Sequence, residues 1–547
     1  MRSGREGILA RSWKRAPLAF LFLTFSTASV AQTPVYPLYG IISAMQQTMT
    51  TNDLRIIATT FDYLQDQTIS DAEIAVIHQY NPAFKVVLYL NSGPTTSASE
   101  VPAVEAARGD LAVFQVASLS AAVSASATSF TLTPRKNQAI VLKASTAPGD
   151  FCPASDSTQN YVTWIRIENE FLRIEAFNAA SNAITVTRAM GGSTAVSHAA
   201  GTPVLSPVYN STYYPGGTAG VGLRYMFDPA KPLAAEWLAN FAGNPTNAQK
   251  TLTTTKYDGM WFDTVEASPY QAVDMNGNAV SSWNTLANAP YTPEVYRMYQ
   301  ETRLNTVQNA LFGSLGHWPF LLANNMASGT YYSGTGDMRN LLLSTAIKPR
   351  PLDGYCIESF ALDGDTGPSP NTGTQWWNNV NMLMDAAQNG LAALPMVYRA
   401  GIKSPFLETS PQRDQMEMYG YASYLLGVEA TGTTKFGIPC LYQANGQRFA
   451  QVSPRYYWAI GKPAESRAPS DLDGYKLAGH STYMRKFTNG LVLVNPATTA
   501  DTPIALGGTY IDPEAGASVQ SITLAATTGK ILLNPSESPR RRRYRSN

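Results

Sequence analysis

Two hydrophobic patterns alternate along most of this chain. Short apolar runs, typical of buried strands, are separated by stretches in which apolar residues recur every three or four positions, as in helices. The strands predicted from these runs span residues 35–46, 61–64, 84–91, 257–263, 318–325, 352–358, 394–399 and 434–438. Strands that alternate with helices at this spacing indicate an α/β fold with a parallel sheet, and eight of them predict a (β/α)8 TIM barrel.

Local signals mark the ends of several predicted helices. Ser70 and Glu73 form a capping box in front of a helix that continues to Tyr80. Asp228, followed by a proline, predicts the N-cap of the helix before the fourth strand. Further helices are predicted over residues 52–60, 293–315, 338–344, 375–388 and 411–426.

The α/β pattern is interrupted once. Residues 111–207 lack helical periodicity and contain only short alternating runs, such as YVTWIRIENEFLRIEAF and AITVTRAM. This pattern predicts an all-β insertion after the third strand. The barrel is therefore expected to comprise residues 32–110 and 208–470.

The two ends of the chain differ from the rest. Residues 1–31 carry basic residues, then the apolar run APLAFLFLTF, then small residues up to Ala31. This is the pattern of a cleaved signal peptide, so we expect a secreted or periplasmic protein without stable membrane insertion. Alternating runs over residues 471–537 predict a C-terminal β-sandwich, and residues 538–547 a disordered basic tail.

The composition argues against several classes of function. Lysine and arginine (40 residues) nearly balance aspartate and glutamate (39 residues), so nucleic acid is not an expected partner. Cys152, Cys356 and Cys440 are too few for a disulfide framework, and the four histidines show no paired-ligand spacing. We expect neither a metal nor another cofactor, and we expect Cys356 to be a small core residue.

Two predicted strands end on a carboxylate. YDGMWFDTV ends its apolar run on Asp263, and LDGYCIESF ends on Glu358; both begin with Asp-Gly. The carboxyl ends of barrel strands meet at one mouth, where active sites are built. Glycoside hydrolysis needs one protonated carboxyl and one ionised carboxylate. We therefore expect Asp263 to act as nucleophile or base and Glu358 as acid/base, with Glu266 as the rival acid.

Other polar residues at strand ends are candidates for binding sugar hydroxyls. They are Asn91, Asn324, Asn325, Tyr398 and Arg399. Each is a weaker signal than the two acids, because asparagine at a strand end is also a common turn former. Trp261, Trp376 and Trp377 offer faces for stacking on sugars but fit core positions better.

Four segments together resemble a known family. They are YDGMWFDTV, LDGYCIESF, FKVVLYLNSG and YMRKFTNGLVLVNP, and they are similar to segments of the barrel proteins grouped as hypothetical glycosyl hydrolase family 15. More distantly they resemble barrels that cleave galactosaminoglycans. The resemblance spans about residues 35–108 and 209–535. It implies a TIM barrel, a C-terminal β domain, and catalysis at Asp263 and Glu358.

The second half of the insertion resembles a small β module of phage tail and surface-associated proteins. The matching residues are Glu170, the strand 182–188, Gly191, Gly192, His198 and Gly201. This resemblance implies a structural or surface-binding accessory rather than chemistry. The insertion is therefore a candidate for contact with a surface partner.

Three functions remain open from the sequence. The favoured one is a secreted glycoside hydrolase that acts on a polysaccharide or a cell-envelope glycan. The alternative is a non-catalytic carbohydrate-binding or surface protein on a barrel scaffold, with the insertion as its working part. A polysaccharide lyase is a third option and would require a Tyr or His base beside the acids. A gap of about 5–10 Å between the Asp263 and Glu358 carboxyls would favour the hydrolase.

Overall fold

The eight strands predicted for the barrel form one parallel sheet. In this computed structural model they are β1 (Leu38–Ile41), β2 (Tyr63–Asp66), β3 (Lys85–Asn91), β11 (Gly259–Asp263), β16 (Phe320–Asn324), β17 (Gly354–Ile357), β18 (Ala392–Pro395) and β19 (Phe436–Pro439). Their order is β18-β17-β16-β11-β3-β2-β1-β19. Neighbours in the sheet are thus neighbours in chain order, apart from β19, which pairs with β1. The two end strands, β18 and β19, are in contact.

The structure describes most of the chain but not all of it. The described residues are 36, 38–41, 49–66, 69–91, 108–135, 139–140, 142, 144, 164–207, 209–210, 227–243, 251–263, 265, 267, 269, 272–273, 279–324, 328–334, 338–345, 350–357, 360–361, 370–396, 411–429, 436–439 and 453–537. The predicted signal peptide and the basic tail lie outside these ranges. Within them, no helix has the length and apolar character needed to cross a membrane.

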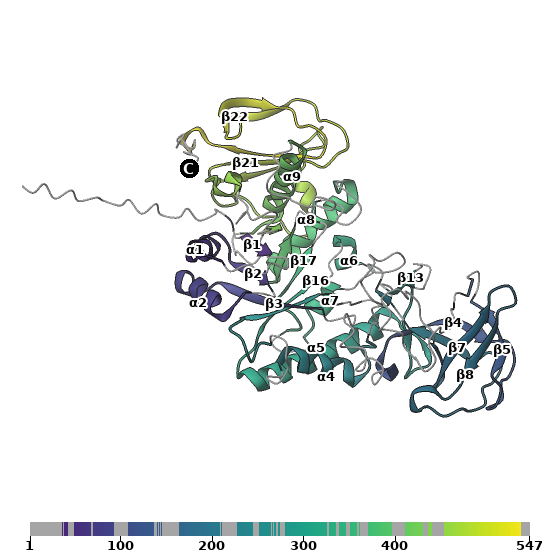
Figure 1. The fold of residues 1–547 in the computed structure, drawn as a ribbon. Coiled ribbons are helices and arrows are strands. Elements are labelled where there is room, and N and C mark those ends of the chain that lie inside the picture. The colour runs from purple at the N-terminus through teal and green to yellow at the C-terminus, as the bar shows by residue number, and fades with distance from the viewer. Residues whose placement is uncertain are drawn as a thin grey trace, which may run out of the picture.

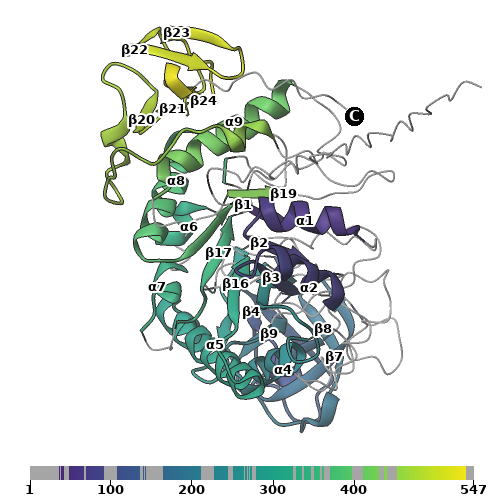
Figure 2. The same ribbon diagram turned by 90° about the vertical axis from the view of Figure 1, so that its left-hand side faces the viewer.

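Helices cover the outer face of the parallel sheet (Figures 1 and 2). They are α1 (Thr51–Thr60), α2 (Asp71–Tyr80), α4 (Pro232–Gly243), α5 (Pro293–Leu315), α6 (Gly329–Ser333), α7 (Met338–Leu342), α8 (Gly373–Gln388) and α9 (Pro411–Gly427). The capping box predicted for α2 is confirmed: the Ser70 hydroxyl accepts from the Glu73 N–H, and the Glu73 carboxylate accepts from the Ser70 N–H.

Asp228 does not cap α4 as predicted. That helix begins four residues later, at Pro232, and Asp228 is instead a fully buried residue of the turn that precedes it. Its carboxylate accepts from the Ala230 N–H and, at 2.5 Å, from the Tyr291 hydroxyl. Burial raises the pKa of Asp228, and these hydrogen bonds oppose that rise. The residue therefore joins this turn to the segment that leads into α5.

The insertion folds into a closed antiparallel barrel (Figure 1). Its strands are β4 (Val113–Leu119), β5 (Ser129–Pro134), β6 (Trp164–Ile167), β7 (Glu170–Asn178), β8 (Ala183–Thr187) and β9 (Pro203–Pro207). They pair in the order β4-β5-β8-β7-β6-β9, and β9 pairs back with β4. This six-stranded ring is the barrel closed by hydrogen bonds among the described strands. Its core is aliphatic, with Ile165, Leu172 and Val204 fully buried.

A short hairpin extends the sheet of the insertion. It consists of β14 (Trp283–Asn284) and β15 (Ala289–Pro290), which follow the fourth parallel strand in the chain. Trp283 pairs with Val113 at the start of β4. The small strands β10 (Tyr209–Asn210), β12 (Ala272–Val273) and β13 (Ala279–Val280) form a separate sheet. The segment after β11 is thus joined to the insertion through the pairing of β14 with β4.

The C-terminal region is one sheet, which corrects the prediction of a β-sandwich. Its strands are β20 (Tyr483–Phe487), β21 (Gly490–Asn495), β22 (Ile504–Asp512), β23 (Ala517–Ile522) and β24 (Thr528–Leu533), in the order β20-β21-β24-β22-β23. On one face, Val492 and Ile531 join the main core beside α9. On the other, Leu491 and Leu532 belong to a small separate core. Helix α9 therefore covers the first of these faces.

Arg485 of β20 fastens this sheet to α9. Its guanidinium is fully buried and donates to the carbonyls of Leu425, Leu426 and Val428 at 3.1, 2.8 and 2.6 Å. These carbonyls lie at the end of α9, where a helix has no partners of its own for them. The same guanidinium lies 5.2 Å from the ring centroid of Tyr475.

Candidate active site

The side chains of the parallel strands alternate between two cores. Met260 and Phe262 of β11 face outward into the core shared with the helices. Trp261 between them faces inward and packs with Val87, Leu322 and Cys356 from the neighbouring strands. Asp263 is two residues after Trp261, so the alternation of the strand brings it to the inward face at the carboxyl end of β11.

Two neighbouring strands hold the Asp263 carboxylate. The Tyr89 hydroxyl on β3 donates to one carboxylate oxygen at 2.5 Å, and the Asn324 side-chain amide on β16 donates to the other at 2.9 Å. All three side chains are half-buried. The donors come from the strands on either side of β11, so they fix the direction of the carboxylate while it stays within reach of solvent.

Tyr89 is the residue of this site that the sequence analysis missed. The prediction took only the polar strand end, Asn91, from the run FKVVLYLNSG. In the structure Asn91 pairs with Asp263 through the backbone register of β3 and β11. The alternation of the strand could have identified it: Val87 faces inward, so Tyr89, two positions later, lies on the same face.

Several predicted site residues lie outside the described residues. They are Glu358, Asn325, Tyr398, Arg399 and the rival acid Glu266. The strands before them are described: β16 ends at Asn324, β17 at Ile357 and β18 at Pro395. The structure therefore brings together Asp263 and Asn324, and it places the backbone of Asn91 beside them.

The repeated Asp-Gly pairs lie at the amino ends of their strands, opposite to the end that carries Asp263. Asp258 donates its N–H to the Val86 carbonyl and accepts the Val86 N–H on its carboxylate, both at 2.8 Å. Asp353 repeats this arrangement with Leu321, at 2.7 and 2.8 Å. Each Asp thus extends the hydrogen bonding to a neighbouring strand by one residue. The sequence repeat marks equivalent strand starts, not chemistry.

The glycines of these pairs are required by close packing. A Cβ atom on Gly259 would lie 1.8 Å from the Phe320 carbonyl oxygen, and one on Gly354 would lie 2.0 Å from that of Ala392. Both distances are far below any real contact, and the obstacle is backbone, which cannot rotate away. Glycine at these positions therefore allows β11 and β17 to approach the next strand in the sheet.

Cys356, Trp261 and Trp376 are confirmed as core residues, whereas Trp377 is half-buried and donates its indole N–H to Asp473. Cys356 is buried, is not part of a disulfide, and has its sulfur 3.0 Å from that of Met396. Trp261 and Trp376 are each 1% exposed, and the Trp376 indole N–H donates to the Ser423 hydroxyl at 2.9 Å. These two tryptophans therefore have no exposed face to offer a sugar.

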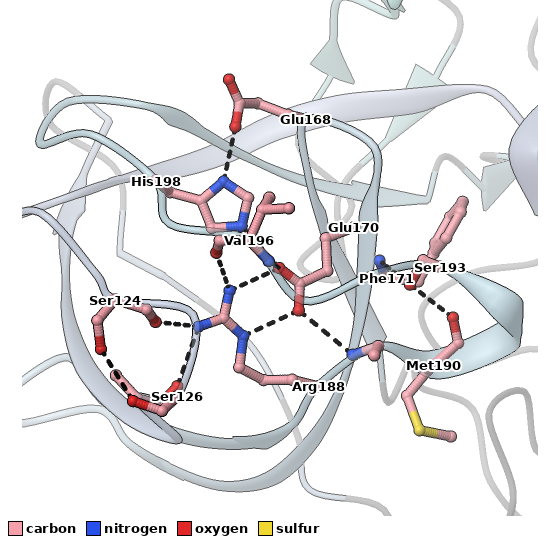
Figure 3. A network of polar contacts seen from close by, with 12 residues as sticks. Ser124, Ser126, Glu168, Glu170, Phe171, Arg188, Met190, Ser193, Val196 and His198 are labelled. Atoms are coloured by element: carbon pink, nitrogen blue, oxygen red, sulfur yellow. Dashed lines mark hydrogen bonds and ion pairs between the residues drawn. The ribbon is translucent and has the colours of Figure 1, made fainter.

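Three of the residues matched to the phage-like module, Glu170, Arg188 and His198, form a buried ionic network (Figure 3). Arg188 donates to both oxygens of the Glu170 carboxylate, at 2.8 and 2.6 Å. His198 contacts Glu170 with one ring nitrogen at 2.8 Å and Glu168 with the other at 2.7 Å. The N–H groups of Ala189 and Val196 also donate to Glu170.

This network fastens a loop to the insertion barrel. Burial alone would raise the pKa of Glu170, but hydrogen bonds from Arg188, His198 and the two backbone N–H groups lower it to about 2. The Glu170 side chain has no exposed surface. A carboxylate closed off from solvent in this way holds residues 188–198 against the barrel and has no access to a substrate.

Comparisons with known proteins give limited overlap. No protein-family model matches the chain, and no curated protein matches it. Among solved structures, a mutant of trehalulose synthase MutB aligns at 11% identity over 92% of this chain and 99% of that chain, with a TM-score of 0.39. The glycoside hydrolase domain of PelA from Pseudomonas aeruginosa aligns at 12% identity over 72% and 90%, with a TM-score of 0.32.

A third solved structure is longer than this protein. The cycloisomaltooligosaccharide glucanotransferase from Paenibacillus sp. aligns at 9% identity over 91% of this chain, with a TM-score of 0.32. The chain spans just over half, 55%, of the length of that enzyme. At TM-scores below 0.4 these overlaps do not establish a shared fold.

Proposed function

We propose that this protein is a secreted glycoside hydrolase that cleaves a polysaccharide or a cell-envelope glycan with Asp263 and Glu358. The observation that carries the proposal is the setting of Asp263. It ends a central strand of the parallel sheet, is half-buried, and accepts hydrogen bonds from the strands on both sides. An oriented carboxylate that still reaches solvent is suited to attack on an anomeric carbon or to activation of water.

A complete (β/α)8 barrel is part of this proposal. Its support is the succession of eight parallel strands, the helices outside them, and the contact between the end strands β18 and β19. In such a barrel the inward side chains at the carboxyl ends of all eight strands meet in one mouth. Asp263 would then share this mouth with residues from the sixth and seventh strands.

The phase of each strand separates the candidates for this mouth. Cys356 and Met396 belong to the inward core, so we expect Glu358 and Tyr398, two positions later in each case, to follow them inward. Asn325 and Arg399 are one position out of phase with this series. We therefore assign substrate contact to Asn91, Asn324 and Tyr398 ahead of those two residues.

The proposed roles follow from the chemistry of the acetal. Glu358 protonates the leaving oxygen, while Asp263 attacks the anomeric carbon or takes a proton from the attacking water. Tyr89 is a positioning residue that holds the Asp263 carboxylate. Asn324 holds it as well, through its side-chain NH2, in addition to the proposed substrate contact. Carboxyl separations of about 5–5.5 Å lead to retention of configuration and about 6.5–9.5 Å to inversion.

Secretion and the role of the insertion complete the proposal. The composition of residues 1–31 supports export. The insertion barrel lies at the opposite end of the molecule from the C-terminal sheet (Figures 1 and 2). From there it would serve as an accessory that contacts a surface glycan or a surface partner.

The test is release of reducing ends from a panel of bacterial exopolysaccharides. Wild type, Asp263→Asn and Glu358→Gln are compared. Asp471→Asn is the matched control, because that carboxylate is exposed and pairs with Arg467 in the segment that precedes the C-terminal sheet. We expect wild type and the control to release reducing ends from at least one polymer and both site variants to be inactive.

Two outcomes would contradict the proposal. Equal release by wild type and both site variants would remove Asp263 and Glu358 from the mechanism. Binding of a polymer without any release, unchanged in both variants, would instead support the non-catalytic carbohydrate-binding protein.

A further inference from the structure

A cavity of about 460 Å³ lies at the amino ends of the parallel strands, opposite to the end that carries Asp263. Lys85 begins β3, Phe320 begins β16, and Asp258 and Asp353 directly precede β11 and β17. The other lining residues are Tyr257, Gln308, His317, Trp318, Pro319 and Arg350. Cavities of about 300–1,000 Å³ are the usual size for small-ligand sites in proteins.

The charges in this cavity are balanced in pairs. Asp258 lies 3.4 Å from the Lys85 ammonium and 3.0 Å from the His78 ring nitrogen. Asp353 lies 3.5 Å from the Arg350 guanidinium. Because each acid has a basic neighbour, the lining offers many hydrogen-bond donors and acceptors without a strong field of either sign. Such a lining suits an uncharged, hydroxyl-rich ligand better than an ion.

An exposed aromatic pair lies at the cavity. Trp318 lines the cavity and is 40% exposed, as is Phe312 on the last turn of α5. Their ring centroids are 4.5 Å apart with an angle of 30° between the planes. Large exposed aromatic side chains often mark binding surfaces. Contact with Phe312 orients the indole of Trp318.

We propose that this cavity is a second saccharide-binding site, which holds an uncharged segment of a glycan chain against Trp318. The apolar face of a pyranose ring would pack on the indole, and its hydroxyl groups would bond to the charged pairs. The choice of a saccharide over other uncharged polyols rests on the proposed function. Binding at the amino end would keep a long polymer attached while another stretch of it occupies the mouth near Asp263.

The two acids of the cavity are not used as probes. Asp258 and Asp353 bond to backbone groups of the neighbouring strands, so their replacement would perturb the sheet itself. Trp318 is exposed and lies in the connection between α5 and β16. Trp318→Ala therefore removes the stacking surface with little expected effect on folding, and Trp318→Phe keeps an aromatic face there.

The experiment is a printed array of neutral and charged oligosaccharides, followed by titration of the saccharides that bind. The proteins are wild type, Trp318→Ala, Trp318→Phe and Asp263→Asn, with Leu286→Ala as a control that removes an exposed apolar side chain from the β14–β15 hairpin. We expect a neutral saccharide to bind wild type at a site that Trp318→Ala weakens about tenfold or more. Trp318→Phe, Asp263→Asn and the control should keep that site.

The proposal is overturned by either of two results. One is a wild-type protein that binds no saccharide on the array. The other is a titration in which Trp318→Ala keeps every binding site of wild type at full affinity. Failure of the hydrolase proposal looks different: reducing-end release by Asp263→Asn would equal that of wild type, whatever Trp318→Ala does to binding.

Discussion

Two carboxylates in this molecule, Glu170 and Asp263, have opposite surroundings. Glu170 begins a strand of the insertion barrel, has no exposed side-chain surface, and accepts from Arg188, His198 and two backbone N–H groups. Asp263 ends a strand of the parallel sheet, is half-buried, and accepts from Tyr89 and Asn324. Both are held in place by hydrogen bonds, but solvent reaches Asp263 alone.

The difference separates a structural carboxylate from the one that we propose to be catalytic. A buried acid surrounded by donors and a guanidinium stabilises the fold as long as every partner is present. A partly exposed acid with donors from the side is oriented and can still meet a substrate. The same side-chain chemistry therefore predicts opposite responses to mutation: loss of stability at Glu170 and loss of turnover at Asp263.

The largest effect is expected at Asp263. Asp263→Asn keeps the size of the side chain but removes its ability to act as a nucleophile or base, so kcat should fall by roughly 10³–10⁴-fold. Reducing-end release from the active polymer measures this loss. The free energy of unfolding, measured by thermal denaturation, should change by less than about 1 kcal/mol, because the site contributes little buried area. A large loss of stability with intact turnover would instead show that Asp263 is a structural carboxylate, like Glu170.

The next largest effect is expected in the insertion barrel. Arg188→Ala leaves the buried Glu170 carboxylate without its guanidinium and should destabilise the insertion by about 3–5 kcal/mol. Hydrogen exchange of the β7 and β8 amides reports this local loss. The control is Glu175→Gln, which breaks the half-exposed pair with Arg173 in the same barrel and should cost under about 1 kcal/mol. If both variants lost the same amount of stability, burial of the ion pair would not determine the free-energy cost of breaking it.

The stability of the insertion should also depend on pH in the acidic range. The pKa of Glu170 falls from 4.5 to about 2 on folding, so its contribution is complete above about pH 4.5 and is lost as the pH falls toward 2. A shift of this size is worth about 3 kcal/mol at most. Exchange of the β7 amides measured between these pH values should show the slope in wild type. Glu170→Gln should remove this pH dependence of stability. If the pH dependence persisted in the variant, a titratable group other than Glu170 would be its cause.

The strands and helices of the main sheet were predictable because local signals agree with the global fold. The apolar runs place all eight strands, and Ser70 with Glu73 marks the start of α2. Closure of the insertion barrel could not be predicted from the sequence. It depends on β4 pairing with both β5 and β9, and the β4–β9 pairing shifts register after Gln115. The C-terminal sheet differs from the predicted β-sandwich for a similar reason: the continuous apolar run of β21 indicates two buried faces but does not say that α9 covers one of them.

The candidate site was predictable only in part. Asp263 stands out as an acid at the end of an apolar run, whereas Tyr89 is hidden inside one, where an aromatic residue suggests only packing. The Asp-Gly repeat pointed to equivalent strands, but its acids bond to the backbone at the amino ends. Position along a strand, rather than residue type, decides whether an acid extends the backbone pairing or faces the proposed mouth.

The smallest effect with a clear sign is expected at Tyr89. Tyr89→Phe keeps the ring in the inward core and removes the hydroxyl that donates to Asp263, so kcat should fall about tenfold with little change in KM. The matched control is Tyr332→Phe, which removes an equivalent hydroxyl bond of 2.6 Å to Asp385 among the outer helices. That control should lose roughly 1 kcal/mol of stability and no activity. If both variants lost only stability, Tyr89 would belong with Glu170 on the structural side, and the hydrogen bond to Asp263 would not serve turnover.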